Sequence, residues 1–183
     1  MHSNDTVSSW VARWAPLIQH GKVLDLACGS GRHARLLARL GHAVTALDRD
    51  AQALAAAAGQ GIATLQYDLE APGAVWPIAP GSLAGLVVTN YLHRPLFGHI
   101  AAALAPNGVL IYETFARGNE IFGKPSNPDF LLNPGELLEL AARGGLRVVA
   151  YEDGVIDTPK PARVQRLCAV GPDGDLGAAR LNL

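Results

Sequence analysis

The sequence is poor in cysteine and in charge, and each shortage excludes a class of protein. Only two cysteines, Cys28 and Cys168, occur among 183 residues. They are too few and too far apart for a disulfide framework or a cysteine-based zinc site, and they fit a reducing compartment. Charged residues make up 17% of the chain and the net charge is -1. The strongly basic character of most nucleic-acid-binding domains is therefore missing.

Long apolar runs are also missing. No run approaches the length that spans a bilayer, and the first residues lack the charged-then-apolar order of a signal peptide. We therefore expect a cytoplasmic protein with no membrane partner and no metal site. Near-neutral charge and short length favour a small-molecule partner over nucleic acid. The oligomeric state stays open between a monomer and a small homo-oligomer.

The chain does have a high hydrophobic content, 49%, and a length that suits one domain over residues 1–183. Apolar spacing predicts an N-terminal helix over about 5–19 that places Trp10 and Trp14 in the core. Strands are predicted at about 22–27, 43–47, 62–66, 83–89, 109–114, 146–152 and 163–170. Further helices are predicted at about 32–40, 50–58, 95–104 and 134–143. The tail from about 171 is rich in glycine and is expected to fray.

This alternation predicts an α/β fold, a doubly wound three-layer sandwich around a mostly parallel sheet. The last two strands are joined by about ten residues with no helix between them. Such a link is too short for a parallel crossover, so it predicts a C-terminal antiparallel hairpin.

A glycine-rich turn follows the first predicted strand. Gly29 and Gly31 permit a tight turn and close approach of a ligand to the backbone. The helix that follows presents free N–H groups to an anionic group. Asp48 ends the second strand, where a carboxylate can accept hydrogen bonds from ribose hydroxyls. The pattern predicts a nucleotide-like cofactor.

The glycines alone do not identify that cofactor, because Gly29-x-Gly31-x-x-Ala34 also spells the dinucleotide motif of NAD-linked oxidoreductases. Three features favour S-adenosylmethionine. Asp25 lies in the first strand, where its charge would repel a pyrophosphate. The C-terminal hairpin and the short chain leave no second nucleotide-binding half. A non-catalytic subunit that only binds the cofactor is a further alternative.

The segment from Val23 to Arg32, VLDLACGSGR, together with Asp48-Arg49, resembles the first two motifs of class I S-adenosylmethionine-dependent methyltransferases. Within that family the turn is similar to that of the small tellurite-resistance-type methyltransferases. The resemblance implies a Rossmann-like methyltransferase fold with seven strands, and methyl transfer that yields S-adenosylhomocysteine. It also implies a set of cofactor-binding residues: Asp25, Ala27, Cys28, Gly29, Ser30, Gly31, Asp48, Arg49, Asp68, Leu69, Asn90 and Tyr91.

Residues after the fourth and fifth strands are candidates for catalysis and acceptor binding, because ligands bind beyond the carboxyl ends of parallel strands. His93 is a candidate general base and Glu113 a second catalytic candidate. Arg94 and Arg117 are candidates for binding the acceptor. The loop 118–130 is long enough to cover an acceptor. The acceptor itself is not identified, although Asn90-Tyr-Leu-His departs from the motif of enzymes that methylate nucleic-acid bases.

Overall fold

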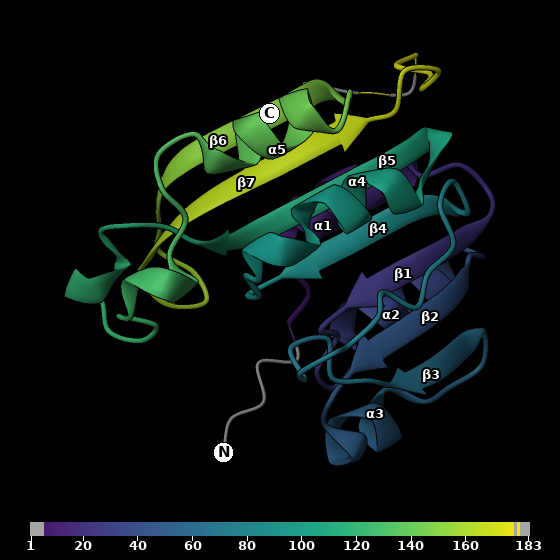
Figure 1. Ribbon diagram of the computed structural model, residues 1–183, viewed down its shortest axis with the longest axis horizontal. Coiled ribbons are helices and arrows are strands. Elements are labelled where there is room, and N and C mark those ends of the chain that lie inside the picture. The colour runs from purple at the N-terminus through teal and green to yellow at the C-terminus, as the bar shows by residue number, and fades with distance from the viewer. Residues whose placement is uncertain (1–5, 178, 180–183) are drawn as a thin grey trace.

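The computed structural model describes residues 6–177 and residue 179 (Figure 1). The strands are β1 (Lys22–Leu26), β2 (Ala43–Asp48), β3 (Ile62–Gln66), β4 (Leu83–Thr89), β5 (Leu104–Phe115), β6 (Arg147–Ile156) and β7 (Ala162–Val170). The helices are α1 (Ser9–Trp14), α2 (Arg32–Arg39), α3 (Ala51–Ala57), α4 (Phe97–Ala103) and α5 (Glu136–Arg143). Short 3-10 turns are η1 (Ala15–Leu17), η2 (Arg94–Leu96), η3 (Asn119–Ile121) and η4 (Pro128–Phe130).

The strands form one seven-stranded sheet in the order β3-β2-β1-β4-β5-β7-β6. Neighbouring strands are parallel from β3 to β5, and β7 lies antiparallel between β5 and β6. The predicted fold class and the C-terminal hairpin are confirmed. The chain order reverses between β1 and β4, and such a switch point is where open α/β sheets bind ligands.

The register brings the carboxyl ends of the parallel strands to one edge of the sheet. Partners in neighbouring strands near this edge are Leu65, Leu47, Leu26, Val88 and Tyr112. In Figure 1 this edge is on the left, together with the loop between β5 and α5. Residues that follow β1 to β5 are therefore close in space although they are distant in sequence.

Apolar side chains bury both faces of the central strands β1, β4 and β5, which explains why these strands are nearly continuous hydrophobic runs. Leu37 of α2, Leu54 of α3 and the two tryptophans of α1 pack against one face. Ile100 of α4 and Leu137 of α5 pack against the other. Figure 1 shows α4 and α5 side by side in front of the sheet, with α1 and α2 behind it.

The two ends of the chain differ from the sequence expectation. The N-terminal helix begins only at Ser9, because the Ser8 hydroxyl accepts from the N–H groups of Trp10 and Val11 and caps it there. Residue 5, the expected start, lies outside the described residues. At the other end the backbone remains hydrogen-bonded past the expected start of fraying. Gly171 donates to Gly108, and Asp173 donates to Pro106.

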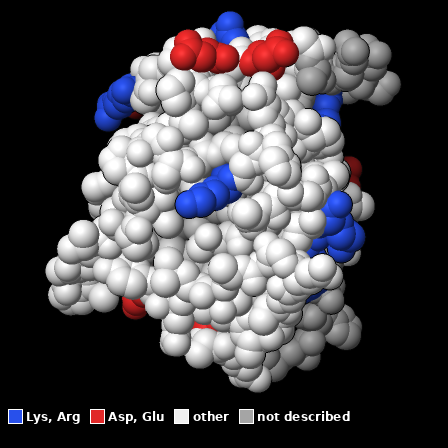
Figure 2. All heavy atoms as spheres, turned by 90° about the vertical axis from the view of Figure 1, so that its right-hand side faces the viewer, with Lys and Arg blue, Asp and Glu red and all other residues white. Residues whose placement is uncertain are grey.

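Charged groups are scattered on the edge of the sheet opposite the carboxyl ends of the parallel strands. Figure 2 shows lysine and arginine side chains there as separate positions on a mainly uncharged face. Over the described part of the chain, no helix has the length and apolar character needed to cross a membrane. The same residues contain no group of three or more His, Cys, Asp or Glu side chains placed to hold a metal ion.

Candidate functional site

The turn after β1 takes the left-handed backbone conformations that its glycines permit. Gly29 has a φ of +54° and Gly31 a φ of +79°. Gly31 also lies so close to α3 that an added Cβ would be 2.5 Å from the Cβ of Ala57. Hydrogen is thus the only tolerated side chain at the start of α2. The turn directs the backbone toward the carboxyl edge of the sheet.

Asp25 lies behind this turn and is fully buried. Its Oδ2 accepts a hydrogen bond of 2.8 Å from the Ala34 N–H, so the carboxyl group caps the first turn of α2. Burial raises the pKa of Asp25 to about 7, although the Ala34 N–H and the Arg32 guanidinium favour the charged form. Asp25 therefore positions the turn from beneath and does not line the cleft described next.

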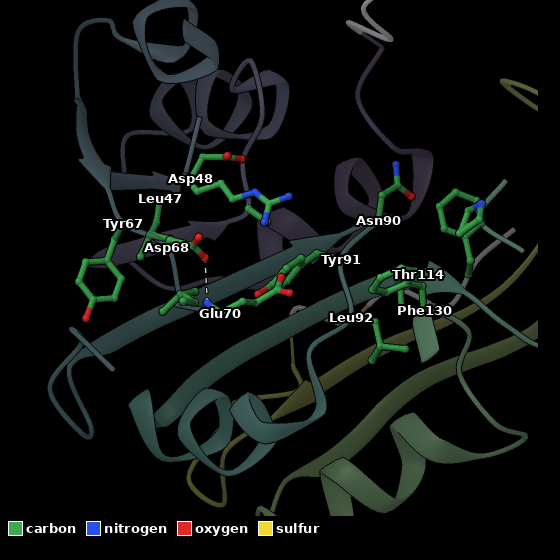
Figure 3. Close-up of a pocket in the computed structure, with 15 residues that line it drawn as sticks. Leu47, Asp48, Tyr67, Asp68, Glu70, Asn90, Tyr91, Leu92, Thr114 and Phe130 are labelled. Carbon is green, nitrogen blue, oxygen red and sulfur yellow. Dashed lines mark hydrogen bonds between the residues drawn. The ribbon is translucent and has the colours of Figure 1, made fainter. Parts of the chain in front are cut away.

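A cleft of about 470 Å³ runs along the carboxyl ends of the strands. That volume is within the usual range for small-molecule sites. Seven of the residues predicted to bind a cofactor line it: Ala27, Asp48, Arg49, Asp68, Leu69, Asn90 and Tyr91. In Figure 3, Asp48, Asp68 and Glu70 lie toward one end, Asn90 and Thr114 lie toward the other, and Tyr91 lies between them.

Asp48 connects the glycine-rich turn to the cleft. Its Oδ2 accepts from the Gly29 N–H at 2.8 Å, and its Oδ1 accepts from the Asp50 N–H at 2.9 Å. Each carboxylate oxygen can accept a further hydrogen bond. Asp48 can therefore hold the turn and still bind a pair of hydroxyl groups in the cleft.

The cleft is electrostatically negative. Its lining holds three carboxylates, Asp48, Asp68 and Glu70, against one guanidinium, that of Arg49. Burial, followed by the nearby carboxylate of Glu70, raises the pKa of the Tyr91 phenol, so this hydroxyl stays protonated at neutral pH. Such a lining favours a ligand with positive charge and hydroxyl donors over a pyrophosphate.

Two residues that line the cleft have backbone strain. Ala27, after β1, has a φ of 53°, and Asn90, after β4, has a φ of 54°. Side chains other than glycine rarely adopt such angles, and each costs about 1–3 kcal/mol when the surroundings enforce it. Strain of this kind clusters at binding sites. Its occurrence at the ends of the two strands that flank the switch point supports the location of the site.

The structure does not bring the remaining turn residues into the cleft lining. Cys28, Ser30 and the two glycines form the turn behind Ala27. Burial, with the carboxylates of Asp25 and Asp48 nearby, raises the pKa of the Cys28 thiol to about 12. The thiol therefore stays protonated and unreactive at neutral pH.

Of the residues predicted for catalysis or acceptor binding, Glu113 and His93 each line a cavity next to the cleft. His93 lines a cavity of about 240 Å³ with Trp76 and His99, and this cavity meets the cleft at Leu69 and Glu70. Arg94 forms an ion pair with Glu136, with a shortest distance of 2.5 Å. It also donates to the carbonyl groups of Asp129 and Leu131. Arg94 therefore fastens the long loop to α5.

Arg117 likewise lies outside both cavities, where its Nε donates to the Asn133 side chain at 2.7 Å. Sequence reasoning missed several residues that line the cleft: Leu47, Tyr67, Glu70, Leu92, Thr114, Phe115, Pro125 and Phe130. Most of them flank strand ends that the analysis identified. Pro125 and Phe130 come from the long loop 118–130, which was expected to cover an acceptor. In the structure this loop borders the cleft.

Comparisons with known proteins agree with this geometry. A protein-family profile described as a methyltransferase domain matches residues 23–108, which include the glycine-rich turn and the ends of β2, β3 and β4. No curated protein sequence matches the chain.

Many solved structures share the fold. TehB from Haemophilus influenzae has a TM-score of 0.72 at 19% identity, and the match covers 92% of this chain and 63% of TehB. A S-adenosylmethionine-dependent methyltransferase from Mesorhizobium loti has a TM-score of 0.69 at 19% identity, with 91% and 99% of the two chains covered.

A third similar structure is geranyl diphosphate C-methyltransferase from Streptomyces coelicolor, solved with Mg²⁺, geranyl diphosphate and S-adenosyl-L-homocysteine. It has a TM-score of 0.65 at 14% identity, and the match covers 89% of this chain and 79% of that one. The profile match supports the predicted resemblance to methyltransferases, and the solved structures confirm the predicted fold.

Proposed function

We propose that this protein is an S-adenosylmethionine-dependent methyltransferase that acts on a small-molecule acceptor and binds its cofactor in the cleft between Asp68 and Asn90. The observation that carries the proposal is the negative lining, three carboxylates against one guanidinium. It suits the positive sulfonium and amino groups of this cofactor, and it opposes the pyrophosphate of NAD. One sheet with two packed faces supports a single catalytic domain.

The cleft residues have distinct proposed roles. Asp48 holds the ribose, because both of its oxygens keep acceptor capacity beside the turn. Asp68 and Leu69 contact the adenine. Ala27 and Asn90 hold the methionine end, because they come from β1 and β4, the strands that flank the switch point.

The chain contributes to the reaction mainly by positioning. When bound, the cofactor supplies a methyl group already activated by the sulfonium. The preformed cleft fixes the donor, and correct alignment of two reactants can lower a barrier by about 7–11 kcal/mol. Where the acceptor carries a proton, Glu113 is the candidate to accept it. Its cavity meets the cleft at Asn90, the proposed methionine end, whereas the cavity of His93 meets the cleft at Leu69, the proposed adenine end.

Thermal unfolding with S-adenosylmethionine, S-adenosylhomocysteine and NAD tests the cofactor site. Ligand at a hundred times its Kd adds about 2.7 kcal/mol of stability, which shifts the Tm by several degrees. We expect shifts with the two adenosyl ligands only, and smaller shifts for Asp48→Asn. A shift with NAD alone would contradict the proposed cleft occupant.

The acceptor class needs a separate experiment. The protein is incubated with methyl-labelled S-adenosylmethionine and a cell extract, and the products are separated by ultrafiltration. We expect enzyme-dependent label in the low-mass fraction, reduced for the Asp48→Asn variant. Label that appears only in protein or RNA would overturn the small-molecule proposal.

A further inference from the structure

A second cavity, of about 200 Å³, adjoins the cofactor cleft. The two share Asn90 and Phe115 as lining residues, so they meet beside the proposed methionine end of the cofactor. The other walls come from both ends of the chain. They are the segment Thr6–Ser9, Glu113 at the end of β5, and the region of the β6–β7 hairpin that includes Lys160 and Arg166.

Hydrogen bonds hold the N-terminal wall of this cavity in place. The Ser8 N–H donates to Nε2 of buried His33 at 3.1 Å, and Arg32 donates to the Thr6 carbonyl at 3.0 Å. Burial, followed by the charge of Arg32, lowers the pKa of His33 to about 3, so its ring stays neutral and able to accept. The indole N–H of Trp10 donates to the Leu167 carbonyl at 3.1 Å and ties α1 to β7.

The lining of the cavity holds more cationic side chains than the lining of the cleft does. Arg32, Lys160 and Arg166 line it together with a single carboxylate, that of Glu113. Arg166 binds Glu113 at 2.5 Å and, farther out, Glu152 at 3.2 Å. Both of these carboxylates therefore lie against Arg166, and Arg32 has contacts of its own. Lys160 forms no ion pair within the described residues, so its charge is available to a ligand.

The size of the cavity limits what can enter it. About 200 Å³ corresponds to about seven water molecules at their liquid volume. A peptide or a nucleic-acid strand cannot be enclosed in such a space. A compact organic or inorganic anion can be enclosed there, beside three cationic side chains.

We infer that this cavity binds the methyl acceptor, and that the acceptor is a compact molecule with a carboxylate or another oxyanion group. The inference rests on the proposed function, because it takes the methionine end of the cofactor to lie at Asn90. The acceptor's nucleophilic atom donates the electron pair of the new bond to the methyl carbon, and the pair of the broken carbon–sulfur bond stays on sulfur. Where that atom carries a proton, the proton passes to Glu113.

An NMR titration of the full chain saturated with S-adenosylhomocysteine tests this inference without requiring the natural acceptor. The probes are sulfate and two matched pairs, acetate with acetamide and benzoate with benzamide, at fixed ionic strength. We expect at least one carboxylate to bind more tightly than its neutral amide, or sulfate to bind measurably. Binding should shift the backbone N–H signals of Ser8 and Lys160. Equal binding of anions and amides, or no binding by any probe, would overturn the inference.

A matched pair of variants locates the effect. Lys160→Gln removes one charge from the cavity and should weaken anion binding about two- to fivefold, the usual range for one exposed ion pair. Lys22→Gln makes the same change at the start of β1, on the opposite edge of the sheet, and should have no effect. Equal effects of the two substitutions would contradict a specific site.

The affinity for S-adenosylhomocysteine separates this inference from the proposed function. Both variants should bind it as the wild type does. If Lys160→Gln weakened the binding of S-adenosylhomocysteine and left anion binding unchanged, the cavity would belong to the cofactor site and the inference would fail. If the wild-type protein did not bind S-adenosylhomocysteine, the proposed function would fail before any anion was added.

Discussion

Replacing Asp25 with Asn should change how the stability of the protein depends on pH. The substitution keeps the shape of the side chain and its capacity to accept from the Ala34 N–H, but it removes the titrating group. Asp25 is fully buried, and its pKa rises from 3.8 to about 7. The folded state therefore holds this proton more tightly than the unfolded chain does.

The sign and size of the effect follow from that difference. A carboxyl group whose pKa is raised on folding makes its full contribution to the free energy of unfolding only below about pH 4. This contribution declines as the pH rises toward 7. Each pKa unit corresponds to about 1.4 kcal/mol, so the full loss is about 4 kcal/mol, of which about 2 kcal/mol falls between pH 5 and 7. The Asn variant lacks this loss.

Urea unfolding of both proteins at several pH values between 5 and 8 measures the effect. The buried His33 contributes a slope of opposite sign, because its pKa is lowered to about 3 and the unfolded chain takes up its proton first as the pH falls. That contribution is present in both proteins and cancels in their difference. Parallel curves for wild type and Asp25→Asn would refute the reasoning.

Four further substitutions test other parts of the site. Gly31→Ala should lower the free energy of unfolding by about 1–3 kcal/mol in urea, because the new methyl group would lie 2.5 Å from the Cβ of Ala57. Asp48→Asn should weaken S-adenosylhomocysteine about tenfold or more by calorimetry, since hydrogen bonds to a charged group contribute about 1.5–3 kcal/mol. Arg94→Ala should cost about 1–2 kcal/mol of stability, since its partly exposed ion pair is screened by solvent, and an accompanying loss of cofactor affinity would contradict its structural role. His93→Ala should change kcat less than tenfold, and a loss of about 10²–10⁴ would identify His93 as the base after all.

The sequence predicted the fold well because its signals were local and repeated. Apolar strands alternate with helices that glycines terminate. The link between the last two strands, expected to be about ten residues and five in the structure, is too short for a parallel crossover. The start of α1 was harder to place. Asn4, Asp5 or Thr6 was expected to cap it, whereas the Ser8 hydroxyl caps the helix in the structure.

The sequence predicted the site only where residues directly follow the carboxyl ends of parallel strands, because ligands bind there. Asp48, Asp68 and Asn90 follow parallel strands directly, and their backbones lead into the cleft. Arg94 follows the same rule, yet it binds Glu136, forty-two residues away, and two carbonyl groups of the long loop. The acceptor cavity depends on even more distant contacts. No local pattern indicates that Ser8, Glu113 and Lys160 line one space.

The hydrogen bond from Trp10 to Leu167 also bears on the order in which the protein folds. It joins residues 157 positions apart. The backbone of the cofactor cleft comes from residues 27–130, whereas the acceptor cavity needs residues 6–9 together with residues 156–166. Contacts of such long range form after local ones, because a large loop must first be closed. During synthesis the donor side can therefore take shape while the acceptor side is still incomplete, and the two reactants meet only in a finished chain.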